Sequence, residues 1–235
     1  MPTSYFTYDG VDSRTFSCYV FDRDTSGGTG PVYDQLTIPG KDGSVLISTK
    51  RRGNVNHTYQ CVIYNNAMEN LENLREFLLS RTGYKRLTDS FHTDEFYSAC
   101  YMDSFSPVIS RDRGLCKCLI SFSRKPQRFL TSGETERTIT SNTTIVNPTR
   151  FSSKPLLRVS GTGSLGIGGT TIGISYNPSY LYIDCEIMEC YYNATSHNDK
   201  ITLSTQEYPV LSPGSNGINL SGISQVRITP RWYRM

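Results

Sequence analysis

Short segments rich in Val, Ile, Thr, Tyr and Phe, separated by Gly, Pro, Asn and Ser, follow one another along almost the whole chain of 235 residues. β-Branched and aromatic residues favour strands, and the separating residues favour turns. The sequence therefore predicts an all-β protein. The clearest predicted strands span residues 15–21, 44–50, 58–64, 96–102, 115–123, 156–160, 180–187 and 224–232.

One segment has a helical period instead. Its apolar residues are Ala67, Leu71, Leu74 and Leu78. Asn66 and Glu69 have the spacing of a capping box, and Gly83 supplies a stop after the segment. We expect one amphipathic helix, at about residues 67–81.

The composition changes near Gly133. Charged residues are sparser beyond this point and glycines are more frequent, while residues 129–155 are dominated by Ser, Thr, Asn and Glu, as in a hinge or an exposed first strand. The pattern predicts an N-terminal β-sandwich-like domain, residues 1–133, which contains the helix. It also predicts a C-terminal β-sandwich or jelly roll, residues 134–235.

Charge, apolar stretches and cysteine content argue against a nucleic-acid-binding protein, a membrane protein and a protein held together by disulfides. The net charge of +3 is too small to indicate a nucleic-acid or anionic-membrane partner. The chain starts without a signal-peptide pattern and has no apolar stretch of roughly 18 residues, so we expect synthesis in the cytosol and no membrane span. Seven cysteines without CxxC spacing suit free thiols. Cys116 and Cys118, two positions apart on one strand, are interpreted as small apolar residues on one face.

A glycine motif resembles a dinucleotide-binding loop. Gly161, Gly163 and Gly166 have GxGxxG spacing, and Asp184 follows near the position of a ribose-binding acid. The motif needs a helix after it, and residues 167–183 are a poor helix. Hairpin turns in a β domain are the better interpretation, and we expect no cofactor.

The spacing of the histidines and their neighbours also gives little support for a catalytic or a metal site. Ser90, His92 and Asp94 lie two positions apart, roughly 6.6 Å on a strand, which is too far for a catalytic hydrogen bond. His57 and His197 have no ligand-spaced neighbours, so ordinary surface or loop histidines are favoured. The chain has none of the common nucleotide-binding, kinase, HExxH or GxSxG motifs, and we expect no catalytic residue, no metal site and no enzyme activity.

Three other groups of side chains remain as candidates. Asp184 and Glu186, with Glu189 nearby, could form a glycosidase pair, but a single solvated strand face is favoured. A tyrosine group could contact a glycan or a protein. Its members are Tyr176, Tyr180, Tyr182, Tyr191 and Tyr192. The basic run Lys50, Arg51 and Arg52 is typical of a solvated strand end, or less often of a protein or nucleic-acid contact.

The order of several segments resembles a known family. No segment is diagnostic alone, but the set spans nearly the whole chain. The segments are FTYDGVDS, PGKDGSVL, GYKRLTDSFHTDEFY, RKPQRFL, NPTRFSSKPLLRVSG, YLYIDCEIMECY, YPVLSPGSNGI and the terminal TPRW. Together they resemble the distal tail (Dit) proteins of long-tailed phages and prophages.

This resemblance implies a structural protein of the virion tail tip, made in the cytoplasm of the bacterial host. It implies an N-terminal domain that forms a hexameric ring around the tail channel, and a galectin-like C-terminal domain. Viral DNA would pass through this channel without sequence-specific contacts to the protein. The implied partners are other copies of the chain, the tail tube protein, and a tail-associated lysin, fibre or receptor-binding protein.

A hairpin pattern around the GKDG segment suggests where assembly contacts lie. We expect residues of about 32–64, including Lys50, Arg51 and Arg52, to contribute to subunit and tube contacts. Two alternatives predict different behaviour. A stand-alone carbohydrate-binding module would be a monomer with affinity for a glycan. A small hydrolase that uses Asp184 and Glu186 would show turnover lost on replacement of either residue.

Overall fold

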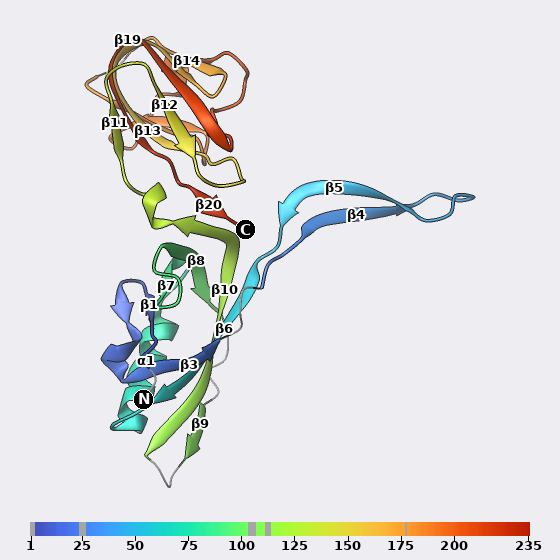
Figure 1. The fold of residues 1–235 in the computed structure, drawn as a ribbon, viewed down its shortest axis with the longest axis vertical. Coiled ribbons are helices and arrows are strands. Elements are labelled where there is room, and N and C mark those ends of the chain that lie inside the picture. The colour runs from blue at the N-terminus through green and yellow to red at the C-terminus, as the bar shows by residue number, and fades with distance from the viewer. Residues whose placement is uncertain (1–2, 24–26, 103–106, 111–113, 177) are drawn as a thin grey trace. The chain divides into compact units, whose positions relative to one another are not determined.

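The computed structural model describes residues 3–23, 27–102, 107–110, 114–176 and 178–235 (Figure 1). The chain forms two compact units, Met1–Arg128 together with Met235, and Phe129–Arg234, which we call unit 1 and unit 2. Antiparallel strands dominate both, and α1 (Ala67–Ser80) is the only α-helix in the described ranges. The predicted all-β class with one helix is confirmed. The sequence placed a boundary at Gly133, whereas the chain passes from one unit to the next between Arg128 and Phe129.

Unit 1 is built on one sheet with strand order β2–β1–β7–β8–β10–β6–β3, and β9 also pairs with β10. The strands are β1 (Phe6–Tyr8), β2 (Val11–Asp12), β3 (Cys18–Arg23), β6 (Val55–Ile63), β7 (Lys85–Asp89), β8 (Glu95–Tyr101), β9 (Pro107–Ser110) and β10 (Leu115–Leu130). The predicted strand at 15–21 starts too early, because Ser13–Phe16 form a short 3-10 helix. Its N-terminus is capped by the Asp12 carboxylate, which accepts a hydrogen bond from the Arg14 N–H.

Helix α1 covers the inner face of this sheet. Leu71, Leu74 and Leu78 are buried, as the helical period predicts, in a core that also contains Phe6 and Phe122. Side chains on the inner face alternate with exposed ones along β10, the pattern of a sheet with one covered face. The helix and the sheet thus share one apolar core.

The predicted capping box of α1 is wrong. Asn66 lies at the N-cap position but has a left-handed backbone (φ 41) instead of the extended one typical of a capping residue, and its side chain makes no capping bond. The amide of Asn70 instead donates to the carbonyl of Asn65, at 2.8 Å. At the other end the extended conformation of Arg81 terminates the helix, and Gly83 (φ 72) lies in the following turn.

The cysteines are free. Cys116 and Cys118 are buried on the same face of β10, as predicted, and Cys118 lies directly opposite Cys61 of β6. Burial raises the pKa of Cys116 to about 11 and that of Cys185 to about 12, so both thiols stay protonated at neutral pH. They act as small apolar groups in the two cores.

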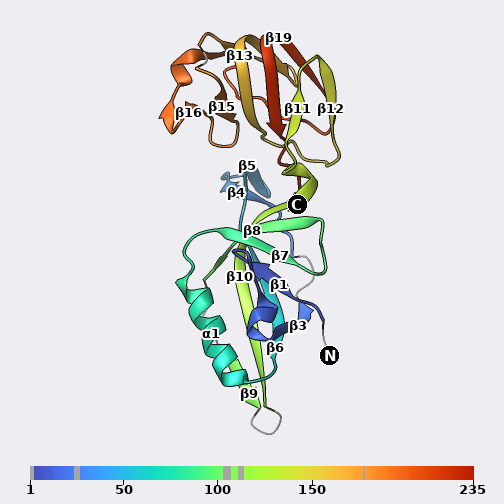
Figure 2. The same ribbon diagram turned by 90° about the vertical axis from the view of Figure 1, so that its left-hand side faces the viewer.

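Unit 2 is a sheet that folds over on itself (Figure 2). Its strands are β11 (Arg137–Ile139), β12 (Thr143–Asn147), β13 (Leu156–Ile167), β14 (Thr170–Ile174), β15 (Leu181–Asp184), β16 (Glu189–Tyr192), β17 (Thr195–Ser196), β18 (Ile201–Leu203) and β19 (Gly214–Thr229). The short strand β20 (Tyr233–Arg234) pairs with β10 instead. The first half of β13 pairs with β15, and the second half pairs with β14. The long strands β13 and β19 therefore contribute to two layers, which enclose one core around Trp232.

Glycines make the bend in these long strands possible. The register of β13 against β19 shifts between Ser160 and Ser164. Gly163 has φ 139, and a Cβ there would lie 2.1 Å from the carbonyl oxygen of Ser221. Gly222 (φ 75) lies opposite. The GxGxxG motif is thus a β-bulge and not the predicted set of hairpin turns, and strands rather than a nucleotide-binding helix follow it.

Candidate assembly surfaces

Unit 1 contains a largely exposed hairpin that forms a two-stranded sheet of its own, β4 (Pro31–Thr37) and β5 (Ser44–Arg52). We call residues 31–52 the arm. Figure 1 shows it as a ribbon that carries no other strand. It turns at the GKDG segment, where Gly40 (φ 79) and Gly43 (φ 78) adopt left-handed conformations. Every residue of β4 is exposed, so within the described ranges no core covers the arm.

The two faces of the arm differ in polarity. Directly paired residues of an antiparallel ribbon share a face, and Asp34 pairs with Ile47 and Leu36 with Val45. Alternation along β4 adds Val32 to this side, which we call the apolar face. The opposite, mixed face carries Tyr33, Gln35, Thr37, Ser44, Leu46 and Ser48. Leu36 and Ile47 are 53% and 51% exposed, so the apolar face is open.

The basic run lies at the root of the arm. Lys50 has φ 56 and sits at an irregularity where β5 has extra residues relative to β4. Lys50 and Arg51 are exposed, whereas the Arg52 guanidinium donates to the carbonyl of Thr29 at 2.7 Å. The predicted solvated strand end therefore fits Lys50 and Arg51, while Arg52 also braces the root. Their role in contacts with other chains stays a prediction.

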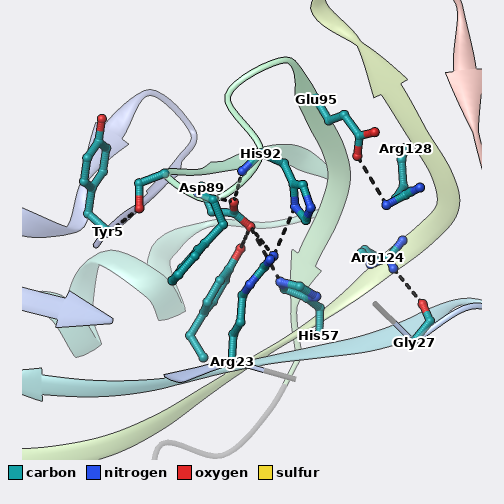
Figure 3. A network of polar contacts seen from close by, with 12 residues as sticks. Tyr5, Arg23, Gly27, His57, Asp89, His92, Glu95, Arg124 and Arg128 are labelled. Atoms are coloured by element: carbon teal, nitrogen blue, oxygen red, sulfur yellow. Dashed lines mark hydrogen bonds and ion pairs between the residues drawn. The ribbon is translucent and has the colours of Figure 1, made fainter. Parts of the chain in front are cut away.

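The segments that flank the arm on both sides form hydrogen bonds with the rest of unit 1. On the first side, the buried Arg124 guanidinium donates to the carbonyl of Gly27 at 2.8 Å (Figure 3). The same guanidinium lies over the ring of Tyr97. On the second side, the Asn54 amide donates to the hydroxyls of Tyr84 at 2.6 Å and Ser123 at 3.0 Å. The root is thus fixed to the sheet although the arm itself is exposed.

A buried polar network lies beside this root, centred on Asp89 (Figure 3). One carboxylate oxygen accepts the backbone N–H groups of Phe91 and His92, both at 2.9 Å. The other accepts the Tyr59 hydroxyl at 3.0 Å and lies 3.6 Å from the Arg23 guanidinium. Burial and the nearby carboxylate raise the pKa of Tyr59 well above its ordinary value, so Tyr59 remains a donor. The network fixes the turn after β7.

This network explains the Ser, His and Asp residues that resembled a triad. Residues 90–94 form a turn and not a strand, because Asp89 holds two of its N–H groups. The Ser90 hydroxyl accepts a hydrogen bond from the N–H of Tyr5, whereas the His92 ring contacts the Arg23 guanidinium. The two side chains therefore have different hydrogen-bond partners. His57 is 2% exposed and packs edge-on to Tyr59, which corrects the prediction of a surface histidine. Its burial follows from its inward position on β6.

Asp184 is a structural residue and not part of a solvated acidic face. The Arg231 guanidinium donates to both of its oxygens, at 2.7 and 2.9 Å, and the Glu186 N–H donates to one of them. Burial opposes ionisation, but these hydrogen bonds outweigh it, so the pKa of Asp184 lies below its ordinary value. Glu186 is exposed in the following turn. This arrangement uses the carboxylate of Asp184 to hold the fold.

Four of the five candidate tyrosines lie together. Tyr182 and Tyr191 are directly paired on β15 and β16, and their rings stack with centroids 5.4 Å apart. The ring of Tyr180 lies edge-on to those of Tyr182 and Tyr192. Tyr176 is separate from them, since its ring lies 6.2 Å from that of His197. His197 is a half-buried loop residue, as predicted.

Sequence reasoning missed the apolar face of the arm. The signal was present as apolar residues two and four positions apart on both sides of GKDG, including Val32, Leu36, Val45 and Ile47. That alternation normally marks a strand with one buried face, and only the structure reveals that this face is exposed among the described residues.

Two further observations concern membranes and metals. None of the helices in the described ranges has the length and apolar character needed to cross a bilayer. Among the same residues, His, Cys, Asp and Glu side chains do not gather in groups of three that could hold a metal ion.

No known family model matches the chain, and neither does any curated protein. Solved structures do match. The Dit protein of phage SPP1, described as a paradigm of the hub adsorption apparatus in phages that infect Gram-positive bacteria, has a TM-score of 0.74 and 16% identity over 96% of this chain and 98% of that chain. Two structures of the phage P2 baseplate in its activated conformation, with Ca and with Sr, have TM-scores of 0.53 and 0.51. Their identities are 11% and 10%, and each match covers 96% of this chain and 97% of that chain.

The matches extend over both units, and the resemblance indicated by the sequence motifs is confirmed at the level of the fold. The chain has the fold of the Dit hub proteins of phage tails.

Proposed function

We propose that this chain is a structural hub of a phage or prophage tail tip, and that its copies close into a ring through the arm. The observation that carries the proposal is the open apolar face of the arm on a chain with the Dit fold. The SPP1 Dit protein is described as part of a hub adsorption apparatus, and the other matched chains belong to a baseplate. A role in assembly accounts for the arm, whereas catalysis has no use for it.

The physical reason is that a two-stranded ribbon without a core is only marginally stable in water. Its open edges and apolar side chains favour pairing with another chain. Contact with the next copy covers the apolar face, and a head-to-tail contact that closes on itself ends in a ring rather than a filament. The family resemblance implies six copies.

The family resemblance implies the partners of such a ring. One face of the ring would join the tail tube, and the other would join a tail-associated lysin, fibre or receptor-binding protein, while viral DNA passes through the channel. Lys50, Arg51 and Arg52 at the root of the arm would contribute to subunit or tube contacts. The protein would act at the tail tip after synthesis in the host cytoplasm, as a structural component without a cofactor.

The test is the solution mass of the purified full chain, measured by size-exclusion chromatography with light scattering over a broad concentration range. Six copies of the 26.5 kDa chain have a mass of about 159 kDa. A species of that mass supports the ring. A monomer at every concentration that binds a defined glycan would instead support the stand-alone carbohydrate-binding module.

A further inference from the structure

Two cysteines of unit 1 lie opposite each other on the neighbouring strands β6 and β10 (Figure 1). Cys61 of β6 is directly paired with Cys118 of β10. Both side chains belong to the core of the unit, with 0% and 4% of their surface exposed. Two thiols that are directly paired on one face of an antiparallel sheet have the arrangement from which a cross-strand disulfide can form.

The spacing of strands and residues selects this pair among the four buried cysteines of unit 1. Directly paired residues have Cα atoms roughly 4.5–5.5 Å apart, and disulfides span about 4.4–6.8 Å. Cys18 and Cys116 are both paired with Ile63, so each is a diagonal neighbour of Cys61. Diagonal neighbours lie about 7–8 Å apart, which is too far for a disulfide. Strand β6 also separates Cys18 from the cysteines of β10.

Hydrogen bonds and burial give the two thiols different chemistry. The sulfur of Cys118 is hydrogen-bonded to the thiols of Cys18 and Cys61, and these bonds lower the pKa of Cys118 below its ordinary value. Burial raises the pKa of Cys61 well above its ordinary value. Because the thiolate is the form that reacts with an oxidant, Cys118 is the nucleophile and Cys61 is the thiol that attacks the oxidised product.

We propose that Cys61 and Cys118 form a disulfide when the chain meets hydrogen peroxide outside the reducing cytoplasm. The Cys118 thiolate attacks one peroxide oxygen and becomes a sulfenic acid, while the O–O bond breaks and the other oxygen leaves, with a proton, as water. The Cys61 sulfur then attacks the Cys118 sulfur, the S–O bond breaks, and the hydroxyl leaves with the Cys61 proton as a second water. Two thiols thus lose two electrons, and one peroxide is reduced to two waters.

The inference rests on the proposed function in one respect, namely that a component of the virion leaves the host cytoplasm. The bond would then join the two strands at the root of the arm. Strand β6 begins shortly after the arm ends and is paired with β10 over its whole length. The loop that the bond closes, residues 61–118, contains α1, β7, β8 and β9. Closing a loop lowers the entropy of the unfolded chain, so oxidation stabilises unit 1.

The test maps the disulfides of the reduced, purified full chain before and after treatment with hydrogen peroxide. Trypsin places Cys61 in peptide 53–75 and Cys118 in peptide 118–124. We expect mass spectrometry without a reductant to find these two peptides joined in the treated protein, and a reductant to release them. The melting temperature should rise by at least about 5 °C on oxidation and fall again on reduction.

Two variants provide the controls. Cys61→Ala should abolish the joined peptides and the rise in melting temperature. Cys116→Ala, on the same face of β10, should keep both, and trypsin separates Cys116 from Cys118 because it cuts after Lys117. Thiols of the wild type that stay reduced, a bond that includes Cys18 or Cys116, or oxidation of Cys118 that ends at the sulfinic acid would each overturn the inference. These three outcomes are read on the wild type and do not depend on the folding of a variant.

Solution mass is measured on the same samples, so that ring formation and disulfide formation are read separately. A chain that forms the Cys61–Cys118 bond but never assembles would overturn the ring and support the disulfide. A ring whose two thiols stay reduced under peroxide would support the ring and overturn the disulfide.

Discussion

Replacement of Ile47 by Asp tests whether the apolar face of the arm is an assembly contact. Complete burial of an isoleucine side chain contributes about 1.5–3 kcal/mol, and since Ile47 is 51% exposed, docking can gain roughly half of this. Enclosing a polar group without a partner costs roughly 2 kcal/mol or more, and the cost for a carboxylate is at least this large. The sum is at least about 3 kcal/mol for each contact, or at least about a 100-fold weaker association at every joint of the ring.

Sedimentation velocity across a concentration series measures the effect. We expect Ile47→Asp to shift the transition from ring to smaller species to a concentration at least about 100-fold higher. Leu46→Asp is the matched control, because Leu46 is 57% exposed on the mixed face of the same strand. If Ile47→Asp assembles like the wild type, or if both variants lose assembly equally, the reasoning about the apolar face is wrong.

Three further predictions concern the root of the arm and unit 2. Charge reversal of Arg51 and Arg52 should weaken assembly or tube binding, and unchanged behaviour in both assays would count against a contact role for the basic run. Gly133→Ala should destabilise unit 2 by about 1–3 kcal/mol, since the new Cβ would lie 2.4 Å from the backbone nitrogen of Trp232; the fluorescence of this single tryptophan during urea unfolding measures it. The lowered pKa of Asp184 means that its ionised form stabilises the folded state above the ordinary pKa of 3.8, and that this contribution is lost as pH falls through the lowered value. Asp184→Asn should therefore lower the melting temperature at neutral pH, and the difference from wild type should shrink in acid.

Local patterns in the sequence were sufficient for α1 and for the clearest strands, but not for shorter strands such as β7, β12 and β14. The β-branched and aromatic runs located the strands, and the spacing of Leu71, Leu74 and Leu78 located α1, because both signals depend on residues a few positions apart. The caps of α1 were not predictable in the same way. The conformation of Asn66 depends on how the chain leaves β6, which the capping-box spacing does not encode.

Features that depend on distant partners escaped prediction. The bulge at Gly163 needs Gly222 on another strand, and the burial of Asp184 needs Arg231 from near the end of the chain. His57 was assigned to the surface because its buried position depends on the register of β6 in the sheet. Family resemblance predicted the fold, while recognition of the open face of the arm required the exposure of individual side chains.

The central claim is that the arm of one copy covers part of the next copy in a closed ring. Electron cryomicroscopy of the purified full chain, at a concentration where light scattering detects assembly, tests it most directly. The account predicts closed rings in which the face containing Leu36 and Ile47 packs against the neighbouring chain. Rings whose arms extend into solvent, or particles that remain single chains at every concentration, would contradict it.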